Sequence, residues 1–426
     1  MKKLNGVELG HFKLTHTTET IDIPLPKQVI IPMSQTMGAP CDCLVQQGDS
    51  VKVGQKIGDS GAFMSAPLHS SVSGEVSAIT DYLLANGKYC KAAVIDTDGL
   101  QTVSEEVTVP EITDKQSLVQ AVRESGCCGL GGAGFPTHIK LNYDAVKTPV
   151  DTLVINGAEC EPYITSDYRE LVENPTDVIE GILMLQRLLG IPKAKICIEE
   201  NKPAAIADFR KRTAELNAIE VLTLPASYPQ GAEKMIIYSA TGRIVAEGEL
   251  PANQGVMVMN VSTVGFICRY SRTGMPLVSR RITVDGNAVT KPANLIVPVG
   301  TIINEVLAFC GTEKPEKVLA GGPMMGMCIY DTDMSVSKTT NAILAFKDVK
   351  APKTTACIRC GRCIRGCPMN LMPTLLEQAY DRRDIDALKE LKVMLCMNCG
   401  CCSYACPANR PLAEKNQLAK AIIPRN

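Results

Sequence analysis

Tryptophan is absent from this chain, and the other aromatic residues are few. Aromatic side chains make up 4% of the 426 residues, and 44 basic residues are balanced by 45 acidic ones, for a formal net charge of -1. Proteins that bind nucleic acids usually need a basic surface, and those that bind single strands also need aromatic rings on which bases stack. The composition therefore argues against a nucleic-acid-binding protein.

Long apolar runs are missing as well. A membrane-spanning helix needs about 20 consecutive apolar residues, and the run around residues 342–346 is far shorter. Residues 1–6 carry charge but lack the apolar segment of a signal peptide. We therefore expect a chain that is not exported, whose cysteines are thiols or metal ligands in a reducing cytosol rather than disulfides. Attachment to a membrane through a partner protein stays open.

Histidine is scarce, and the motifs of several enzyme classes are missing. The four histidines are scattered and follow no metal-ligand spacing, so we expect structural roles for them. The sequence also contains no Ser/His/Asp constellation, Walker loop or zinc-protease motif. The sequence therefore carries no motif of a serine hydrolase, a P-loop nucleotide hydrolase or a zinc protease.

Cysteine, by contrast, is plentiful. Nine of the 19 cysteines lie in the last 70 residues, where the spacing C-x2-C-x2-C-x3-C-P occurs twice, from Cys357 and from Cys396. This is the spacing of bacterial two-cluster ferredoxins, in which the fourth cysteine of each run binds the other cluster. It predicts two [4Fe–4S] clusters. We assign Cys357, Cys360, Cys363 and Cys406 to cluster one, and Cys396, Cys399, Cys402 and Cys367 to cluster two.

Zinc is the alternative to this interpretation. Paired C-x2-C motifs also form zinc sites, although a zinc site built from such pairs does not require a third cysteine in each run.

Cys401 is a ninth cysteine beyond the eight assigned ligands, and we expect it to be a spectator. Arg359, Arg362 and Arg365 alternate with the first ligands; they either raise the cluster potential, attract an acidic partner or form a solvated surface.

A glycine-rich loop and a strand end mark a second candidate site. Residues 129–136 match G-x-G-x-x-G, but the apolar pattern of residues 117–123 predicts a helix before the loop, where a Rossmann turn needs a strand. Such a loop still lets backbone N–H groups approach a phosphate or a flat ring, although a tight structural turn is an equal alternative. Residues 153–155 predict a buried strand that ends in the polar segment 156–163, at the position where α/β folds bind ligands.

Together these segments resemble a known family. The Gly129 loop and residues 156–162 resemble the flavin- and NADH-binding subunit of respiratory complex I. A fuller resemblance, to the C subunits of Rnf electron-transport complexes, also takes in residues 38–40, 65–74, 228–234 and both cysteine runs. It implies a non-covalent FMN, NAD(H) as substrate, and Glu159 and Glu161 beside the nicotinamide. The cofactor-binding residues that it implies are Gly129, Gly131, Gly132, Gly134, Phe135, Lys140, Asn156, Gly231, Glu233, Asn260 and Thr263.

The predicted fold is a multidomain α/β protein. Residues 1–110 are expected to form a barrel-sandwich hybrid of short strands, residues 111–270 the FMN- and NADH-binding α/β domain, residues 271–346 a β-grasp domain of the soluble-ligand-binding type, and residues 347–426 a helical two-cluster module. Within these, we expect a hairpin over residues 281–289, a helix over 303–309, and helices over 371–395 interrupted near residues 381–384.

The resemblance implies an ion-translocating ferredoxin:NAD+ oxidoreductase subunit that passes electrons between NAD(H), FMN and two [4Fe–4S] clusters. Its expected partners are the membrane subunits of the Rnf complex and the iron–sulfur subunit that receives ferredoxin electrons, and its expected location is the cytoplasmic face of the membrane. Two alternatives are a related corrin (cobalamin) reductase of propanediol metabolism, and a flavin-free scaffold that only relays electrons.

Overall fold

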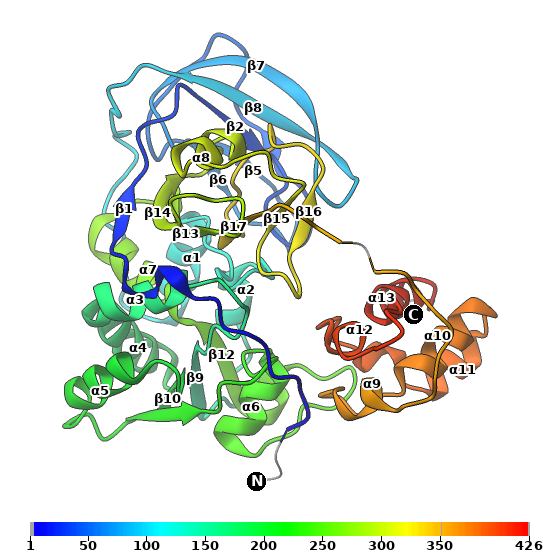
Figure 1. Cartoon of the computed structure of the whole chain (residues 1–426). Helices are drawn as coiled ribbons and strands as arrows, with labels where there is room; N and C mark the ends of the chain where they lie inside the picture. Colours follow the sequence, from blue (N-terminus) through cyan, green and yellow to red (C-terminus); the bar gives the residue numbers. More distant parts are fainter. Residues whose placement is uncertain (1–3, 351, 425–426) are drawn as a thin grey trace.

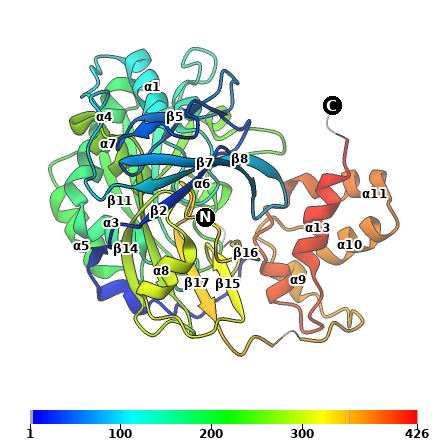
Figure 2. The same ribbon diagram turned by 90° about the horizontal axis from the view of Figure 1, so that it is seen from above.

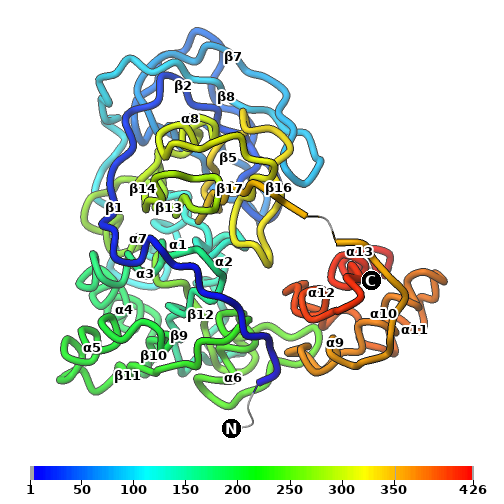
Figure 3. Tube along the Cα trace, in the orientation of Figure 1, coloured from blue at the N-terminus to red at the C-terminus, as the bar shows by residue number. Residues whose placement is uncertain are grey.

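The structure, a computed structural model, describes residues 4–350 and 352–424. Four sheets form the larger body, and a helical module that contains both cysteine runs stands beside it (Figures 1 and 2). The Cα trace shows residues 4–18 running along the edge of the larger body before the first sheet begins (Figure 3). In the described residues, no helix has both the length and the apolar character needed to cross a lipid bilayer.

A parallel four-stranded sheet lies in the middle of the chain. Its order is β11-β10-β9-β12, so the chain moves outward on one side of β9 and then returns to its other side for β12. Both faces are buried, because alternate residues of β9 join two different apolar clusters. The strands are β9 (Thr152–Gly157), β10 (Lys193–Glu199), β11 (Ile219–Leu224) and β12 (Val256–Asn260).

Helices surround this sheet. The predicted helix before the glycine loop is confirmed as α1 (Lys115–Glu124), which begins with an Asp114 capping box. The others are α2 (Thr137–Leu141), α3 (Ser166–Glu173), α4 (Pro175–Leu189), α5 (Pro203–Arg212), α6 (Glu233–Thr241), η2 (Pro251–Gln254) and α7 (Val261–Thr273).

Two small antiparallel sheets form the N-terminal β unit, as the short alternating strands predict. They share one apolar core, to which Val29, Ile57 and Ile95 belong. One sheet has the order β2 (Gln28–Pro32), β8 (Tyr89–Thr97), β7 (Gly74–Leu83) and β4 (Ser50–Val51); the other has β3 (Asp42–Cys43), β5 (Lys56–Asp59) and β6 (Leu68–His69).

A six-stranded mixed sheet follows, with the order β1-β14-β13-β17-β15-β16. The predicted hairpin exists, but its second strand begins at Ala293 rather than before Val289, because Val289 instead bridges to Thr312. The predicted helix over 303–309 is confirmed as α8. The elements are η1 (Leu14–Thr17), β1 (Thr20–Asp22), β13 (Ser279–Asp285), β14 (Ala293–Pro298), α8 (Ile303–Phe309), β15 (Lys317–Ala320), β16 (Met327–Ile329) and β17 (Ala342–Phe346).

The C-terminal module is made of short helices. Helix α10 ends at Asp381, and Arg383 has a left-handed φ of 57°, so the predicted interruption near residues 381–384 is confirmed. The exact boundaries of the four-part division stay predictions; β1, for example, pairs with β14 rather than with the N-terminal β unit. The module contains α9 (Arg362–Arg365), α10 (Pro373–Asp381), α11 (Ile385–Glu390), η3 (Val393–Leu395), α12 (Cys401–Tyr404) and α13 (Leu412–Ala421).

Candidate functional site

Two asparagines lie side by side at one edge of the parallel sheet. Asn156 near the end of β9 and Asn260 at the end of β12 are paired in register. The strand order changes direction between these two strands, and α/β sheets bind ligands in the crevice outside the carboxyl ends of strands at such a switch point. The sheet therefore places both predicted asparagines where a ligand is expected.

The glycine loop is fixed beside this edge. The Leu130 N–H donates a 3.0 Å hydrogen bond to Thr263 Oγ1, and the Gly129 N–H donates one of 2.8 Å to the Phe135 carbonyl. A Cβ added to Gly131 would lie 3.2 Å from Asn260 Nδ2, so loop and strand end nearly touch. The structure thus brings the predicted loop residues together with Asn260 and Thr263.

The loop has an open side, and two buried basic side chains bind backbone carbonyls in or just before it. Gly132 has a φ of 112°, is exposed, and has no atom within 4 Å of a Cβ built on it. The buried Arg280 donates to the Leu130 carbonyl at 3.0 Å, and the buried Lys338 donates to the Gly126 carbonyl at 2.8 Å. Open backbone together with nearby basic side chains suits an anionic phosphate, so these residues fit the phosphate end of FMN.

The remaining cofactor residues lie on the α6 side of the sheet edge. Lys140 Nζ forms a 2.9 Å ion pair with Glu233 and donates to the Val258 carbonyl. Asn156 Nδ2 donates a 2.8 Å hydrogen bond to the Gly231 carbonyl. Lys140, Asn156, Gly231 and Glu233 are therefore connected in pairs at this edge, although no single contact joins all four.

Glu159 faces the interior of the protein. Its Oε1 accepts hydrogen bonds from the backbone N–H groups of Asp167, at 2.7 Å, and Tyr168 at the start of α3, while Oε2 is buried without a hydrogen-bond partner. Burial raises the pKa of this carboxyl to about 7, and the nearby Lys13 ammonium opposes that rise. Glu159 thus caps a helix in this structure, and its predicted place beside a nicotinamide stays a prediction.

Glu161 is bound to a different part of the chain. Its carboxylate accepts hydrogen bonds from the backbone N–H groups of Met324, at 3.1 Å, and Met325, at 3.0 Å. Burial raises the pKa of Glu161 to about 7, and these two bonds counteract the rise. The methionine-rich turn after β15 therefore reaches the strand-end loop that carries both glutamates.

Two residues that bind this loop or the sheet edge, Lys13 and Asp167, belong to no motif recognised in the sequence. Lys13 Nζ donates to the carbonyls of Glu159 at 2.9 Å, Glu161 at 3.0 Å and Ile164 at 2.5 Å. Asp167 accepts hydrogen bonds from Asn260 Nδ2 and Ser262 Oγ. An acidic residue in the first turn of α3 is a weak signal for Asp167, but nothing near Lys13 in the sequence indicates its partners because they lie about 150 residues away.

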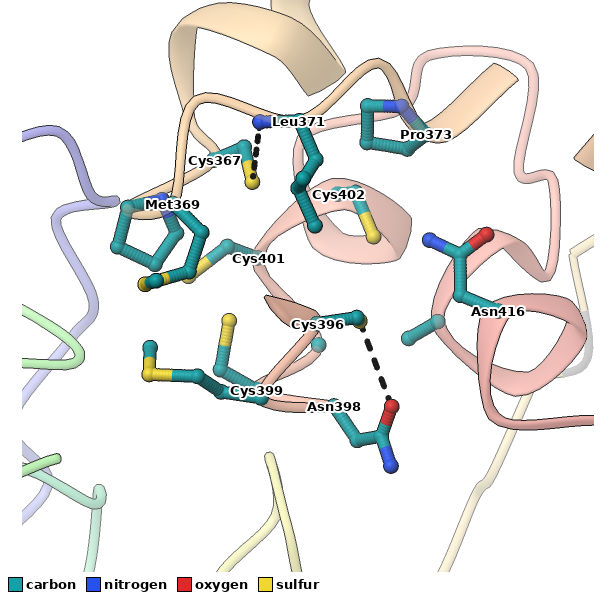
Figure 4. Close-up of a pocket in the computed structure, with 14 residues that line it drawn as sticks. Cys367, Met369, Leu371, Pro373, Cys396, Asn398, Cys399, Cys401, Cys402 and Asn416 are labelled. Atoms are coloured by element: carbon teal, nitrogen blue, oxygen red, sulfur yellow. Dashed lines mark hydrogen bonds between the residues drawn. The ribbon is translucent and has the colours of Figure 1, made fainter. Parts of the chain in front are cut away.

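The cysteines assigned to cluster two surround one cavity. Cys367, from the first run, lines it together with Cys396, Cys399 and Cys402 from the second, around about 350 Å³ of space that is partly open to solvent (Figure 4). Leu371 N–H donates to Cys367 Sγ at 3.4 Å, as backbone groups commonly do to cluster sulfurs. In the described residues, no three His, Cys, Asp or Glu side chains gather as they would around a single metal ion. Cys401 lines this space as well, and the four assigned thiols around it fit the donor set of a [4Fe–4S] cluster.

The cysteines assigned to cluster one form a second neighbourhood. Burial raises the pKa of Cys363, and the thiols of Cys406 and Cys357 contribute to that rise. Cys363 and Cys406 also belong to one apolar cluster with Leu412. Cys357 and Cys360 are exposed. The crossing of Cys367 and Cys406 to opposite groups agrees with the predicted assignment, which stays a prediction for the ligands themselves.

Cys401 joins the cysteine module to the parallel-sheet domain. It is fully buried and packs with Cys399 against Tyr228, and Met324 lies at the same contact. A hydrogen bond from Cys401 lowers the pKa of the Cys399 thiol to about 7. The expected spectator therefore packs at the contact with the sheet domain, next to Cys399, which is assigned to cluster two.

Four family sequence models match successive parts of the chain. The RnfC barrel sandwich hybrid domain matches residues 2–100, the Nuo51 FMN-binding domain residues 122–269, the SLBB domain residues 281–327, and the 4Fe-4S dicluster domain residues 350–407. They confirm the predicted fold class and support FMN and iron–sulfur clusters as cofactors.

A solved structure and two curated relatives extend these matches. The crystal structure of an NAD+-reducing [NiFe]-hydrogenase in the H2-reduced state is 20% identical with a TM-score of 0.52, covering 74% of this chain and 64% of that one, which shows a shared fold. The C subunit of the Na(+)-translocating ferredoxin:NAD(+) oxidoreductase complex of Acetobacterium woodii is 40% identical over 94% of this chain and 93% of its own. The C subunit of the proton-translocating complex of Clostridium ljungdahlii is 42% identical over 87% of this chain and 82% of its own. The chain therefore belongs to the RnfC family, the C subunits of ion-translocating ferredoxin:NAD+ oxidoreductase complexes.

Proposed function

We propose that this chain is the NAD(H)-oxidising or NAD+-reducing electron-transfer subunit of an Rnf complex. One observation carries the proposal: a single chain joins a nucleotide-type sheet edge to a module that contains both cysteine runs, and the two parts touch at Tyr228 and Cys401. When bound, FMN supplies the exchange between two-electron hydride chemistry and the one-electron chemistry of the clusters.

The protein's own residues position these groups. The Gly129 loop offers backbone N–H groups to a phosphate, and Asn156 and Asn260 border the open sheet edge beside it. Glu159 and Glu161 lie on the next loop, where Lys13 fixes the backbone through three carbonyls. The buried contact of Cys399 and Cys401 with Tyr228 excludes water between the sheet domain and cluster two. Cluster two is thus the one near the flavin domain.

Ion translocation belongs to other subunits in this proposal. The chain attaches to the cytoplasmic face of the membrane through membrane subunits of the complex and through the iron–sulfur subunit that handles ferredoxin electrons. Extraction of the native membrane with a mild detergent tests this attachment. Co-purification of the chain with membrane subunits is expected, and a chain that fractionates alone in low salt contradicts it.

Anaerobic purification followed by flavin and iron assays tests the electron-transfer function. We expect about one FMN and about eight irons per chain, the content of one flavin and two cubanes. NADH should bleach the flavin absorbance first and the cluster absorbance afterwards. A preparation without flavin supports the relay or scaffold alternative, and reduction of a corrin at a comparable rate to ferredoxin supports the corrin reductase alternative.

A further inference from the structure

The cysteine module, residues 357–424, is held to the larger body by few contacts. It follows an exposed linker over residues 347–350 and 352–356, which forms no helix or strand. Its helices pack mainly on one another, and in the described part of the chain none packs extensively on a helix or strand of the larger body (Figures 1 and 2). Domains joined in this way move relative to each other unless further contacts fix them.

The sheet domain meets this module at Tyr228. The side chains of Tyr228, Cys399 and Cys401 are buried in one apolar cluster. Tyr228 lies three residues before Gly231, whose carbonyl accepts the hydrogen bond from Asn156 at the sheet edge. The separation between the flavin edge and cluster two therefore depends on how firmly Tyr228 and the second cysteine run are held together.

A segment near the N-terminus, residues 5–13, covers this contact, and we call it the N-terminal strap. The Val7 N–H donates a 2.9 Å hydrogen bond to the Tyr228 carbonyl, and the Tyr228 N–H donates one of 3.1 Å to the Val7 carbonyl. A Cβ added to Gly6 would collide with the Tyr228 carbonyl oxygen, so the strap lies directly against this backbone. The Val7 side chain packs against the buried cluster that contains Cys399. One residue of the strap thus contacts both the sheet domain and the second cysteine run.

The strap also reaches the first cysteine run. Asn5 Nδ2 donates a 2.8 Å hydrogen bond to Asn370 Oδ1, and a Cβ added to Gly366 would lie 3.4 Å from Val7 Cγ1. Gly366 and Asn370 flank Cys367, which is assigned to cluster two together with three cysteines of the second run. The strap therefore contacts both of the chain segments that are expected to supply ligands to cluster two.

The other end of the strap is anchored to the strand-end loop. Lys13 donates to three carbonyls of this loop, and the Tyr163 N–H donates a 3.0 Å hydrogen bond to the His11 carbonyl. Phe12 stacks on Tyr163 with 5.1 Å between the ring centroids. Terminal segments are poorly ordered unless they are tied down. This one is bound to the sheet domain at one end and to both cysteine runs at the other.

We propose that the N-terminal strap is a clamp that sets the separation between the flavin edge and cluster two, with Gly6 and Val7 as positioning residues. The proposal rests on the function proposed above. The step that the clamp governs is the transfer of one electron at a time between FMN and cluster two. One centre is oxidised and the other reduced, no bond between heavy atoms forms or breaks, and a proton released from the flavin passes to water. Such a transfer depends on a short and constant separation, which the exposed linker by itself does not provide.

A double substitution in the full-length chain, loaded with FMN and both clusters, tests the clamp. Gly6→Ala places a methyl group against the Tyr228 carbonyl, and Val7→Pro removes the N–H that donates to this carbonyl. The control is Glu8→Ala/Gly61→Ala. It alters an exposed side chain of the strap and a glycine with no atom within 4 Å of a built Cβ. FMN content, iron content and the cluster potentials should match the wild type in both variants.

Two kinetic measurements separate hydride transfer from electron transfer. Rapid anaerobic mixing with NADH times the reduction of the flavin, which should keep its wild-type rate in both variants. Flash photoreduction of the bound flavin starts electron transfer to the clusters without NADH. We expect this transfer to slow at least about 10-fold in Gly6→Ala/Val7→Pro and less than about 2-fold in the control, because lost positioning lowers a rate without changing its driving force. Hydrogen–deuterium exchange at the Tyr228 amide should accelerate only in Gly6→Ala/Val7→Pro.

The outcomes separate this proposal from the one on which it rests. A wild-type rate of cluster reduction after the flash in Gly6→Ala/Val7→Pro overturns the clamp. Loss of FMN or iron, or a shifted cluster potential, also overturns it, because the strap would then be part of a cofactor site itself. Slower reduction of the flavin by NADH in this variant overturns it as well. If NADH fails to reduce the wild-type flavin while the flash still reduces the clusters, the proposed function fails and the clamp stands.

Discussion

The carboxylate of Glu161 accepts a 3.1 Å hydrogen bond from the backbone N–H of Met324, which lies at the contact between the sheet domain and the second cysteine run. The strand-end loop and the cysteine module are therefore connected through one turn of chain. A Cβ on Gly322 would lie 2.3 Å from Glu161 Oε2, so a side chain there would displace the Glu161 carboxylate. Changes at Glu161 are expected to act on both the sheet edge and the domain contact.

Glu161→Gln should flatten the pH dependence of stability. Folding raises the pKa of Glu161 from 4.5 to about 7, so the folded chain binds a proton more tightly than the unfolded chain between these values. The stability contributed by this carboxyl is present below about pH 4.5 and is lost as pH rises through about 7, by about 1–3 kcal/mol. Gln carries no such proton. Thermal unfolding from pH 5 to 8 should therefore show a smaller decline in the variant.

An exposed carboxyl provides the control for that measurement. Glu106→Gln alters a solvent-exposed side chain and should leave the pH profile as in the wild type. Parallel profiles for wild type and Glu161→Gln contradict the burial of an ionising Glu161. In the same preparations, NADH oxidation should decline more than FMN content if Glu161 borders the nicotinamide.

Lys13→Met should loosen the strand-end loop that carries Glu159 and Glu161. The substitution removes one buried donor from three carbonyls and a cation from the neighbourhood of Glu159, at a cost of about 3 kcal/mol. We expect a lower midpoint of thermal unfolding and slower reduction of the flavin by NADH, with FMN retained. Lys88→Met, at an exposed site, should change neither property. A stable Lys13→Met variant with normal NADH kinetics contradicts the role of this lysine.

Gly132→Ala should lower FMN affinity by at least about 10-fold, because the added methyl group enters the open side of the loop where backbone must approach a ligand closely. Gly48→Ala is a matched control, since Gly48 also has a positive φ and no atom within 4 Å of a built Cβ, but lies in the N-terminal β unit. Both variants should lose about 1 kcal/mol of stability from backbone strain. Flavin fluorescence titration checks the prediction; an equal loss of FMN in both variants contradicts it.

Cys367→Ser and Cys406→Ser should each affect the cluster of the opposite run. Cys367 lines the cavity of Cys396, Cys399 and Cys402, so its replacement should alter the same electron paramagnetic resonance signal as Cys399→Ser. Cys406→Ser should alter the signal that Cys363→Ser alters. Flavin reduction by NADH should persist in the Cys363→Ser variant. Loss of the signal of the same run after each replacement contradicts the crossed assignment.

Features encoded by short spacing could be predicted from the sequence. The spacing of each cysteine run predicts three ligands within a few residues, and the helices over 115–124 and 303–309 follow from local apolar patterns. The hairpin after β13 could be placed only in part, because contacts of Val289 with a distant turn, rather than local turn residues, set where the second strand begins. Pattern and spacing are local properties, and they determine local structure.

By itself, the sequence determined the cofactor classes, the fold class and the glycine and cysteine motifs. Only the tertiary structure decided that Lys13 binds the strand-end loop that carries both glutamates. It also decided that Glu161 binds the turn at Met324 and that Cys401 packs against Tyr228. Each of these contacts joins segments more than 100 residues apart, and buried polar groups must find partners wherever folding brings a donor and an acceptor together. Spacing along the chain carries no information about such partners, because they are set by the packing of whole domains.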